Sequence, residues 1–309
     1  MLDAPSVRIT QISKYEEDIA SRQKLIPRWR QEKLQRSSVL VIGAGALGNE
    51  VVKNLVLIGV GTIYVVDFDL VELSNLNRCI FFRRKDVKEK KSKVKAIAEK
   101  ASELSPYPHT RVIPLEANIH DIPYDHEMYT ESEVYVSCLD NLAARLEVNA
   151  AALFNKKFLV NGGMNGFLGY VQVVIPYQTA CLQCDVRSEE LQTMYQRLSC
   201  SGTPLDLSGP KIPALPTTTS IIGGILAQET VKILLGAEQF IANGRWPRET
   251  GEPLAGKRLY MNTALNVYGV YEIERNPKCP ACSTLSEQEK RIAAEWGREE
   301  GGDNAEQGR

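Results

Sequence analysis

The feature that most constrains the fold is a glycine-rich turn between a run of strand-forming residues and a helix-forming segment. In SSVLVIGAGALG, Gly43, Gly45 and Gly48 follow the apolar run in the pattern G-x-G-x-x-G. Glycine lets the backbone turn tightly and lets a nucleotide approach the helix N-terminus, whose free N–H groups attract phosphate. The pattern alone is modest evidence, because small-residue turns also serve helix packing. Its strand–turn–helix context predicts a nucleotide site.

The segments that follow alternate between strand-like and helix-like patterns. Strands are expected in GTIYVVD, RVIPLEANI, EVYVSCLD and FLVNG, and helices in KSKVKAIAEKASEL and NLAARLEVNAAALFN. Strands that alternate with helices form a parallel sheet covered on both faces. The sequence therefore predicts an α/β fold with a Rossmann-like, mostly parallel sheet and helices on both faces.

After about Gly162 the pattern changes. GFLGYVQVVIP alternates and is β-rich, so an antiparallel portion is expected there, continued by strands in KRLYMN and LNVYGVYEI. Residues 201–216 are dense in Gly and Pro and predict a long loop. The helix TTTSIIGGILAQETVKILLG comes next and is expected to stop at Gly236.

Charge and hydropathy exclude several classes of function. The chain has 309 residues and a net charge of −1, which argues against nucleic acid or an acidic membrane as the main partner. MLDAPSVRIT has no apolar core behind a basic start, so no secretory signal is expected. No window reaches the roughly 18 uncharged apolar residues of a membrane helix. We expect a soluble cytoplasmic protein.

Polar side chains that suit a triphosphate follow the second expected strand. Asp67 lies 19 residues after Gly48, where a carboxylate can hold ribose hydroxyls. An NAD enzyme needs only that acid, but here Asn75 and Arg78 follow it, and Lys93 opens the next helix. Arginine offers fixed, charge-assisted donors to phosphate oxygens. ATP is therefore favoured, and an NAD-dependent oxidoreductase on the same turn is the alternative.

Asp140 ends the expected strand EVYVSCLD, at the edge where α/β sheets present ligands. A carboxylate that faces phosphates normally does so through Mg²⁺. Arg78, Lys93 or Asp140 taken alone could be a solvated loop or cap residue. Together at one sheet edge they favour ATP with Mg²⁺.

Several of these stretches together resemble the adenylation domain of ubiquitin-activating enzymes and of their bacterial and archaeal relatives, which activate the sulfur carriers of molybdopterin and thiamine synthesis. The stretches are VLVIGAGALGNEVVKNLVLIGVG, VVDFDLVELSNLNR, KSKVKA and SCLDN, and the similarity runs from about Arg22 to Cys282. The resemblance implies ATP-dependent activation of the C-terminal carboxylate of a small β-grasp protein ending in Gly-Gly. The products would be an acyl-adenylate and pyrophosphate, with a conjugating enzyme or a sulfur donor as the downstream partner.

The resemblance also implies residue roles. Asp67 would bind the ribose, Asp140 would hold Mg²⁺, and Asn141 would lie beside the nucleotide. The phosphates would be held by Asn75, Arg78 and Lys93. The full implied nucleotide-binding set is Gly43, Gly45, Ala46, Gly48, Asp67, Asp69, Asn75, Arg78, Lys93, Asp140 and Asn141.

Arg22, in SRQ, matches an arginine that the family supplies to the active site of the partner subunit. A homodimer is therefore expected. A non-catalytic binding subunit of a heterodimeric activating enzyme is a further alternative, and it predicts a damaged phosphate site.

Four of the seven cysteines form two Cys-x-x-Cys pairs, in CLQC (Cys181, Cys184) and CPAC (Cys279, Cys282). Two such pairs can supply four thiolates to one tetrahedral Zn²⁺. The alternatives are unrelated pairs or redox pairs, but neither pair has the βαβ context of a thioredoxin-like motif. The spacing predicts a structural zinc that pins the middle segment to the C-terminal strands, and members of the resembled family carry the same four cysteines.

Cys200 adjoins the Gly/Pro-rich stretch. Relatives with a transfer step place a nucleophilic cysteine on such a crossover loop, so a thioester on Cys200 is a hypothesis from position alone, and a passive cysteine is the alternative. Cys79 and Cys138 are expected to be packing residues.

The chain is expected to form one domain over residues 1–289. This domain would contain an N-terminal helical segment (1–37), a nucleotide-binding half (38–162) and an antiparallel, zinc-bearing half (163–289). Residues 290–309 are polar and are expected to form a disordered tail.

Overall fold

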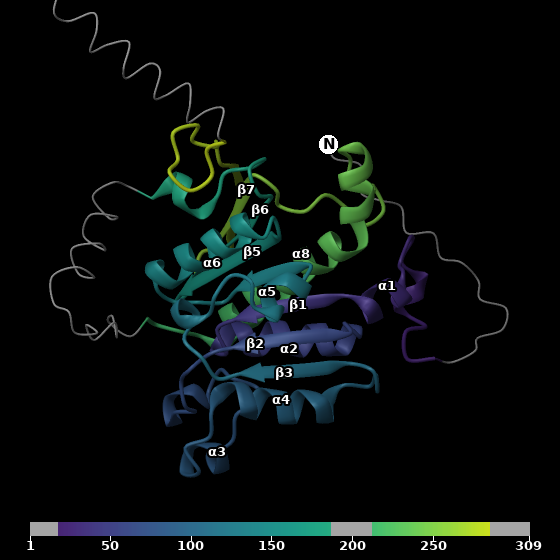
Figure 1. The fold of residues 1–309 in the computed structure, drawn as a ribbon. Helices are drawn as coiled ribbons and strands as arrows, with labels where there is room; N and C mark the ends of the chain where they lie inside the picture. The colour runs from purple at the N-terminus through teal and green to yellow at the C-terminus, as the bar shows by residue number, and fades with distance from the viewer. Residues whose placement is uncertain (1–17, 187–211, 285–309) are drawn as a thin grey trace, which may run out of the picture.

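The computed structural model describes residues 18–186 and 212–284, which form a three-layer α/β arrangement around one eight-stranded sheet (Figure 1). The strand order is β3-β2-β1-β4-β5-β6-β7-β8. The strands are β1 Ser38–Ile42, β2 Thr62–Val66, β3 Arg111–Leu115, β4 Val134–Ser137, β5 Phe158–Asn165, β6 Leu168–Val174, β7 Lys257–Asn262 and β8 Val267–Glu272.

The sheet changes from parallel to antiparallel at β5, as the sequence predicted. β3, β2, β1, β4 and β5 pair in parallel, whereas β5 to β8 pair as antiparallel neighbours. The parallel strands read as continuous apolar runs because both of their faces are covered. From β1 the chain runs to β2 and β3 on one side, and β4 then pairs with the other side of β1. The order of strands therefore reverses between β1 and β4.

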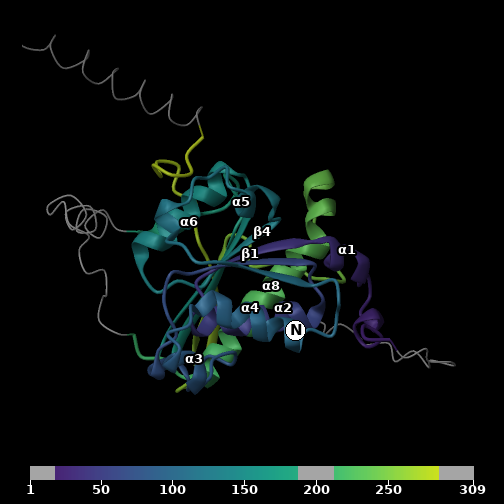
Figure 2. The same cartoon turned by 60° about the horizontal axis from the view of Figure 1, so that its bottom comes forward.

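The helices lie on both faces of the sheet (Figure 2). α2, α4 and α8 pack on one face, where Val39 and Val41 of β1 point into their core. α5 and α6 cover the other face, toward which Leu40 and Ile42 point. The helices are α1 Gln31–Arg36, α2 Ala46–Ile58, α3 Arg84–Lys88, α4 Lys93–Leu104, α5 Glu127–Glu131, α6 Leu142–Phe154 and α8 Pro216–Asn243. Short 3₁₀ segments are η1 Gln23–Leu25, η2 Leu73–Asn75, η3 Ile119–Asp121 and η4 Leu182–Asp185.

The predicted end of α8 at Gly236 is wrong. The helix continues to Asn243 and ends at Gly244, whose left-handed backbone (φ 71°) lets its N–H bond to the carbonyl of Phe240. Gly236 serves packing instead, because a Cβ there would come within 2.9 Å of the Trp246 ring. A glycine at a tight interface and a glycine at a helix end look the same in sequence.

α8 is long and apolar enough to cross a membrane, judged by length and composition. However, 61% of its most apolar window is buried inside the protein. Its Gly223 lies so close to α2 that a Cβ would come within 2.4 Å of the Glu50 side chain. The helix is therefore largely a core element, and the cytoplasmic location stays a prediction.

The described part of the N-terminal segment, from residue 18, contains η1 and α1. It is anchored to the body of the protein by ion pairs that run from Arg30 to Glu238 (3.0 Å) and from Lys33 to Glu133 (2.7 Å). Residues 1–17 and the predicted tail at 290–309 lie outside the described residues.

Candidate functional site

The three glycines of the turn between β1 and α2 meet three different demands. Gly43 has φ 97°, a left-handed conformation that favours glycine. A Cβ at Gly48 would lie 1.9 Å from the carbonyl oxygen of Gly43, so glycine there lets α2 pack on the turn. Nothing lies within 4 Å of a Cβ built at Gly45. The protein itself does not require glycine at Gly45, and the open space fits the approach of a ligand to the first turn of α2.

These demands predict opposite outcomes for two alanine substitutions. Gly48→Ala is expected to destabilise the fold by about 1–3 kcal/mol, because the methyl group must push α2 off the turn. Gly45→Ala is expected to leave the unfolding midpoint unchanged and to weaken nucleotide binding about tenfold, because the methyl group occupies the ligand's approach. Thermal unfolding and nucleotide titration of both variants test this. Equal effects of the two substitutions on both measurements would contradict the assignment.

Asp67 ties the turn to the end of β2. One oxygen of its carboxylate accepts a hydrogen bond from the backbone N–H of Ala44 at 2.7 Å, and the other accepts one from Asp69 at 2.8 Å. Burial raises the pKa of the Asp67 carboxyl above its usual value, while the Lys93 ammonium and these N–H groups oppose the shift. The predicted ribose-binding acid therefore also holds the glycine turn in shape.

Lys93 begins α4 and points toward the same acids. Its Nζ lies 2.6 Å from a carboxylate oxygen of Asp69, and its backbone N–H bonds to the Asp69 carbonyl. Burial disfavours the charge on Lys93, but the carboxylates of Asp67 and Asp69 outweigh burial and raise its pKa. Lys93 is thus a buried, fully charged cation beside the turn. Asp69, which is half-exposed, is its partner in this arrangement.

Asn75 and Arg78 lie on and just beyond η2. Asn75 is buried, and its side-chain oxygen accepts a hydrogen bond from the backbone N–H of Glu72. Arg78 donates to the carbonyl of Ser74 and to the side-chain oxygen of Asn77. No carboxylate in the described part of the chain forms an ion pair with Arg78. Its charge is therefore available to an anionic ligand.

The Cys79 thiol lies close to the cations Arg78 and Lys93. Burial raises the pKa of its thiol to about 11, and Arg78, Lys93 and Asp67 all lie close enough to act on it. Cys138 is also buried, which raises the pKa of its thiol to about 12. Both thiols stay protonated at neutral pH and belong to the core, so the prediction that they are packing residues is confirmed.

Asp140 and Asn141 lie at the point where the strand order reverses. A Cβ at Gly43 would come within 2.8 Å of the carbonyl oxygen of Cys138, so the loop after β4 runs against the glycine turn. Asp140, two residues later, is exposed at this edge. Asn141 caps α6 by accepting a hydrogen bond from the N–H of Ala144 at 2.8 Å. Ligands of open α/β sheets bind at this kind of reversal.

Arg145 is a site residue that the sequence reasoning missed. Its guanidinium donates to the carbonyl of Leu139, to the carbonyl of Gly162 (2.8 Å) and to the side-chain oxygen of Asn161 (2.5 Å). It thereby fastens the loop that carries Asp140 to β5. The available signal was its position one helical turn after Asn141, which places both on the same end of α6.

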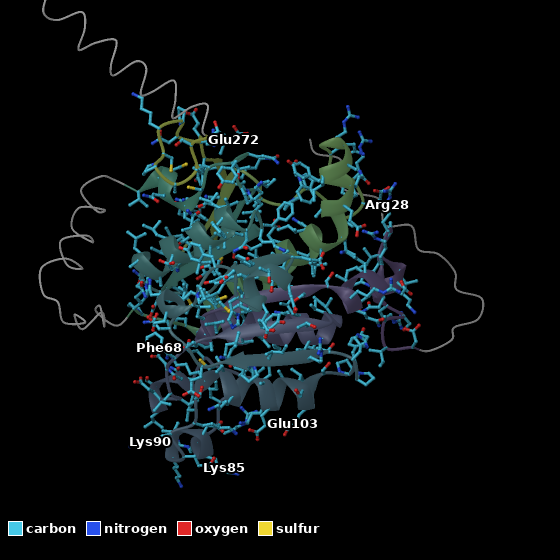
Figure 3. The ribbon with its side chains drawn as sticks, in the orientation of Figure 1. Arg28, Phe68, Lys85, Lys90, Glu103 and Glu272 are labelled. Atoms are coloured by element: carbon cyan, nitrogen blue, oxygen red, sulfur yellow. The ribbon has the colours of Figure 1, made fainter. Side chains whose placement is uncertain are left out.

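Arg22 lies near the amino ends of the parallel strands, whereas the glycine turn lies at their carboxyl ends. The next residue, Gln23, accepts a hydrogen bond from the hydroxyl of Tyr107 (3.0 Å), which precedes the amino end of β3. Figure 3 shows Arg28 of the same segment on one side of the molecule and Phe68, just beyond β2, on the other. The role of Arg22 at the site of a partner subunit stays a prediction. Cys200 lies outside the described residues.

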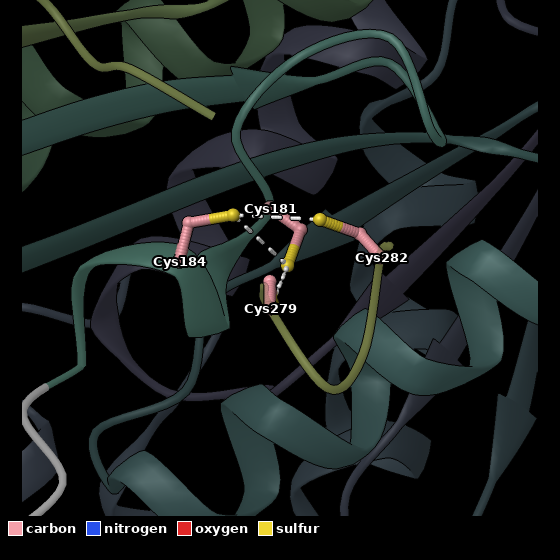
Figure 4. Close-up of side chains that lie close together, drawn as sticks. All are labelled: Cys181, Cys184, Cys279 and Cys282. Atoms are coloured by element: carbon pink, nitrogen blue, oxygen red, sulfur yellow. Dashed lines mark hydrogen bonds between the residues drawn. The ribbon is translucent and has the colours of Figure 1, made fainter. Parts of the chain in front are cut away.

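The four paired cysteines converge on one point (Figure 4). Their sulfur atoms all lie within 4.8 Å of one another. The separations are 3.7 Å for Cys181–Cys279, 3.9 Å for Cys181–Cys184 and 3.4 Å for Cys184–Cys282. Four sulfurs bonded at about 2.3 Å to a tetrahedral zinc lie about 3.8 Å apart, so the cluster suits Zn²⁺.

The cluster also joins the segments that the sequence predicted. The backbone N–H of Leu182, in the first pair, donates to Asn149 of α6 at 3.0 Å. Arg275, after β8, donates to the carbonyl of Cys282. A metal here would hold the segment after β6, the segment after β8 and α6 together.

Comparison with known proteins places the chain among nucleotide-dependent enzymes. A family model described as ThiF family matches residues 15–281. The sulfur carrier protein adenylyltransferase of Thermus thermophilus is 30% identical over 275 residues, which cover 87% of this chain and 92% of that protein. A yeast (Saccharomyces cerevisiae) protein named ubiquitin-activating enzyme E1-like is 37% identical over 50% of this chain. The Drosophila melanogaster Nedd8-activating enzyme E1 catalytic subunit is 34% identical over 55% of it.

The alignments span only 23% and 39% of the length of the yeast and fly relatives. Among solved structures, Escherichia coli MccB with ATP matches with a TM-score of 0.67 and 20% identity, over 87% of this chain and 75% of that one. PaaA matches with a TM-score of 0.62 and 21% identity, over 82% of each chain. At these identities the structures share the fold.

Proposed function

The chain belongs to the ThiF family, and we propose that it uses ATP to activate the C-terminal carboxylate of a ubiquitin-like or sulfur-carrier protein, called the carrier below. The relative that covers nearly the whole chain is named a sulfur carrier protein adenylyltransferase. The relatives matched over about half of the chain are named as activating enzymes. Both kinds of name support adenylation of a small carrier protein.

The reaction would be an attack by a carboxylate oxygen of the carrier on the α-phosphorus of ATP. A bond forms between that oxygen and phosphorus, the bond to the bridging oxygen breaks, and pyrophosphate leaves. A terminal carboxyl group has a pKa of about 3.3–3.7, so it is ionised at neutral pH and needs no general base. The enzyme has to align the reactants and stabilise the charge on the phosphates.

The described residues suit this task. The open space at Gly45 would admit the phosphates to the first turn of α2. Arg78 and Lys93 would bind phosphate oxygens, and Asp69 would keep Lys93 in place. Asp140, an exposed carboxylate at the same edge, would hold Mg²⁺, which when bound neutralises phosphate charge.

One observation carries the proposal: the glycine turn, open at Gly45, meets the loop of Asp140 where the strand order reverses. The test is exchange of labelled pyrophosphate into ATP, measured with a purified β-grasp protein that ends in Gly-Gly. Exchange should require the carrier and should be lost when its two terminal glycines are deleted. Binding of NAD without any carrier-dependent exchange would favour the oxidoreductase instead.

A damaged phosphate site would point to a non-catalytic subunit, but each side chain expected to bind phosphate is present and charged or polar. The step after adenylation stays a prediction. It is either transfer of the acyl group to Cys200, with a conjugating enzyme downstream, or direct delivery of the adenylate to a sulfur donor.

The position of Arg22 predicts complementation between inactive subunits. We expect Arg22→Ala and Asp140→Ala each to abolish exchange, and the two variants co-expressed in equal amounts to recover about a quarter of wild-type activity. Half of the dimers would then be mixed, and each mixed dimer would contain one intact site. Co-expression of Asp140→Ala with Lys93→Ala is the matched control. It should recover nothing, because both residues serve the site of their own chain.

Light scattering supplies the second measurement for this prediction. A monomer with full activity, or no recovery in the first mixture, would remove the homodimer from the proposal.

A further inference from the structure

A row of glycine and tyrosine residues crosses the last four strands on the face that carries α6. Gly163, Tyr170, Tyr260 and Gly269 are register partners from β5 to β8. The glycines make room for rings lying on the sheet: a Cβ at Gly163 would lie 2.5 Å from the Tyr170 ring, and one at Gly269 would lie 2.7 Å from the hydroxyl of Tyr271. Ring centroids are 6.1 Å apart for Tyr170–Tyr260 and 5.9 Å for Tyr260–Tyr271. These three rings form what we call the tyrosine platform.

A cavity of about 570 Å³ extends along the tyrosine platform to Asp140. Its other walls include the side chains of Met164, Leu168 and Val267. Among the described residues that line it, Asp140 and Arg145 are the only charged ones, and Arg145 is already bonded to three oxygens. Arg258, whose guanidinium lies over two of the platform rings, is likewise already bonded, to Asp185, Tyr260 and Gln172. An acidic group placed over the platform would therefore lose water without gaining an unpaired cation, whereas an apolar group would gain contact.

Arg258 holds the platform rigid from one end. Its guanidinium lies over the rings of Tyr170 and Tyr260, 5.7 Å and 5.6 Å from their centroids. It donates to the hydroxyl of Tyr260 and to the carboxylate of Asp185, each at 2.7 Å. Asp185 follows Cys184 directly, so the platform is fastened to the four-cysteine cluster. A surface fixed in this way is built before any ligand arrives.

We propose that the tyrosine platform selects the carrier by the residues that precede its terminal Gly-Gly, accepting apolar side chains and rejecting acidic ones. This inference rests on the proposed function. Neighbouring strands lie about 4.8 Å apart, so the distance across the sheet from β8 to β5 is about 14 Å. An extended chain of about four residues spans this distance. A tail whose two glycines end beside Asp140 places its preceding residues on the platform. The cavity that reaches from Asp140 to Tyr271 is the observation that commits this surface to the carrier tail.

Two tyrosines of β8 provide a matched test. Tyr271 belongs to the platform, and Tyr268, three residues earlier, points to the other face and does not line the cavity; their exposed fractions are 58% and 55%. Tyr271→Ala should raise the KM for the carrier about tenfold in pyrophosphate exchange, with kcat and the KM for ATP unchanged within about twofold. Tyr268→Ala should change none of these.

Variants of the carrier test the selectivity itself. The probe is a Gly-Gly-ended β-grasp protein that supports exchange, with each of the third to fifth residues from its C-terminus changed to Leu or to Glu. Leu should be favoured over Glu in kcat/KM by about tenfold at one position or more, and Tyr271→Ala should shrink that ratio.

Each other outcome is decisive. Equal use of Leu and Glu carriers, or an unchanged KM in Tyr271→Ala, overturns the platform assignment and leaves the proposed function standing. A lower unfolding midpoint of Tyr271→Ala with an unchanged KM means that the chain itself fills the cavity, which also overturns the assignment. Absence of exchange with every Gly-Gly carrier overturns the proposed function and the assignment with it.

Discussion

Asp140→Ala is expected to lower carrier-dependent pyrophosphate exchange by about 10³-fold, because the metal it would hold is expected to supply several kcal/mol of charge stabilisation in the transition state. The folded structure should survive, since Asp140 is exposed and no described ion pair depends on it. The measurement is the initial rate of exchange at saturating ATP and carrier, alongside the thermal unfolding midpoint. Asp140→Asn should be nearly as inactive, because it keeps the volume of the side chain and removes its charge.

Asp125→Ala is the control for this effect. Asp125 is another exposed aspartate, and it precedes the amino end of β4, whereas Asp140 follows the carboxyl end of that strand, so the loss of Asp125 should leave exchange unchanged. Near-normal exchange by folded Asp140→Ala protein would remove the Mg²⁺ assignment, whatever the control shows.

The second large effect is expected at the four-cysteine cluster. Replacing Cys282 with serine should abolish stoichiometric zinc binding and lower the unfolding midpoint by about 10 °C or more, because metal binding contributes folding free energy. Cys282 is fully buried, so its loss cannot be compensated by a ligand from solvent. The measurements are metal analysis of protein purified without chelator, with about one zinc per chain expected for wild type, and a thermal melt. Cys181→Ser should behave in the same way.

Cys79→Ser separates the loss of zinc from the loss of a buried thiol. Cys79 is buried in the core and takes no part in the cluster. This variant should keep its zinc and lose only the packing contribution of one thiol. Wild-type protein without zinc, or a Cys282→Ser protein as stable as wild type, would count against a structural metal.

The nucleotide turn could be predicted because its chemistry lies within short segments. Gly43, Gly45 and Gly48 follow an apolar strand, and Asp67 ends the next one, so the four come together whenever β1 and β2 pair. The structure adds what each residue contacts. Asp69, for example, is the partner of Lys93, a pairing across 24 residues that no local pattern contains.

Other features escaped prediction because they depend on contacts between distant segments. Gly236 lies inside α8 and leaves room for the ring of Trp246, a contact that can be known only once the following loop is placed. Arg145 reaches β5 because α6 lies against that strand, and nothing in NLAARLEVNAAALFN shows where its guanidinium goes. The role of Arg22 at a partner's site stays a prediction; the tertiary structure adds that its neighbour Gln23 contacts Tyr107, just before the amino end of β3.

The sequence by itself determined the class of fold, the turn that would receive a nucleotide and the four cysteines suited to zinc. These follow from periodicity, from glycine positions and from ligand spacing, which are properties of short stretches of chain. Only the tertiary structure decided that Tyr170, Tyr260 and Tyr271 share one face beside Asp140. Their alignment depends on the register of β6, β7 and β8, and α8 separates β6 from β7 in sequence. Register is set by the packing of whole faces against a common core.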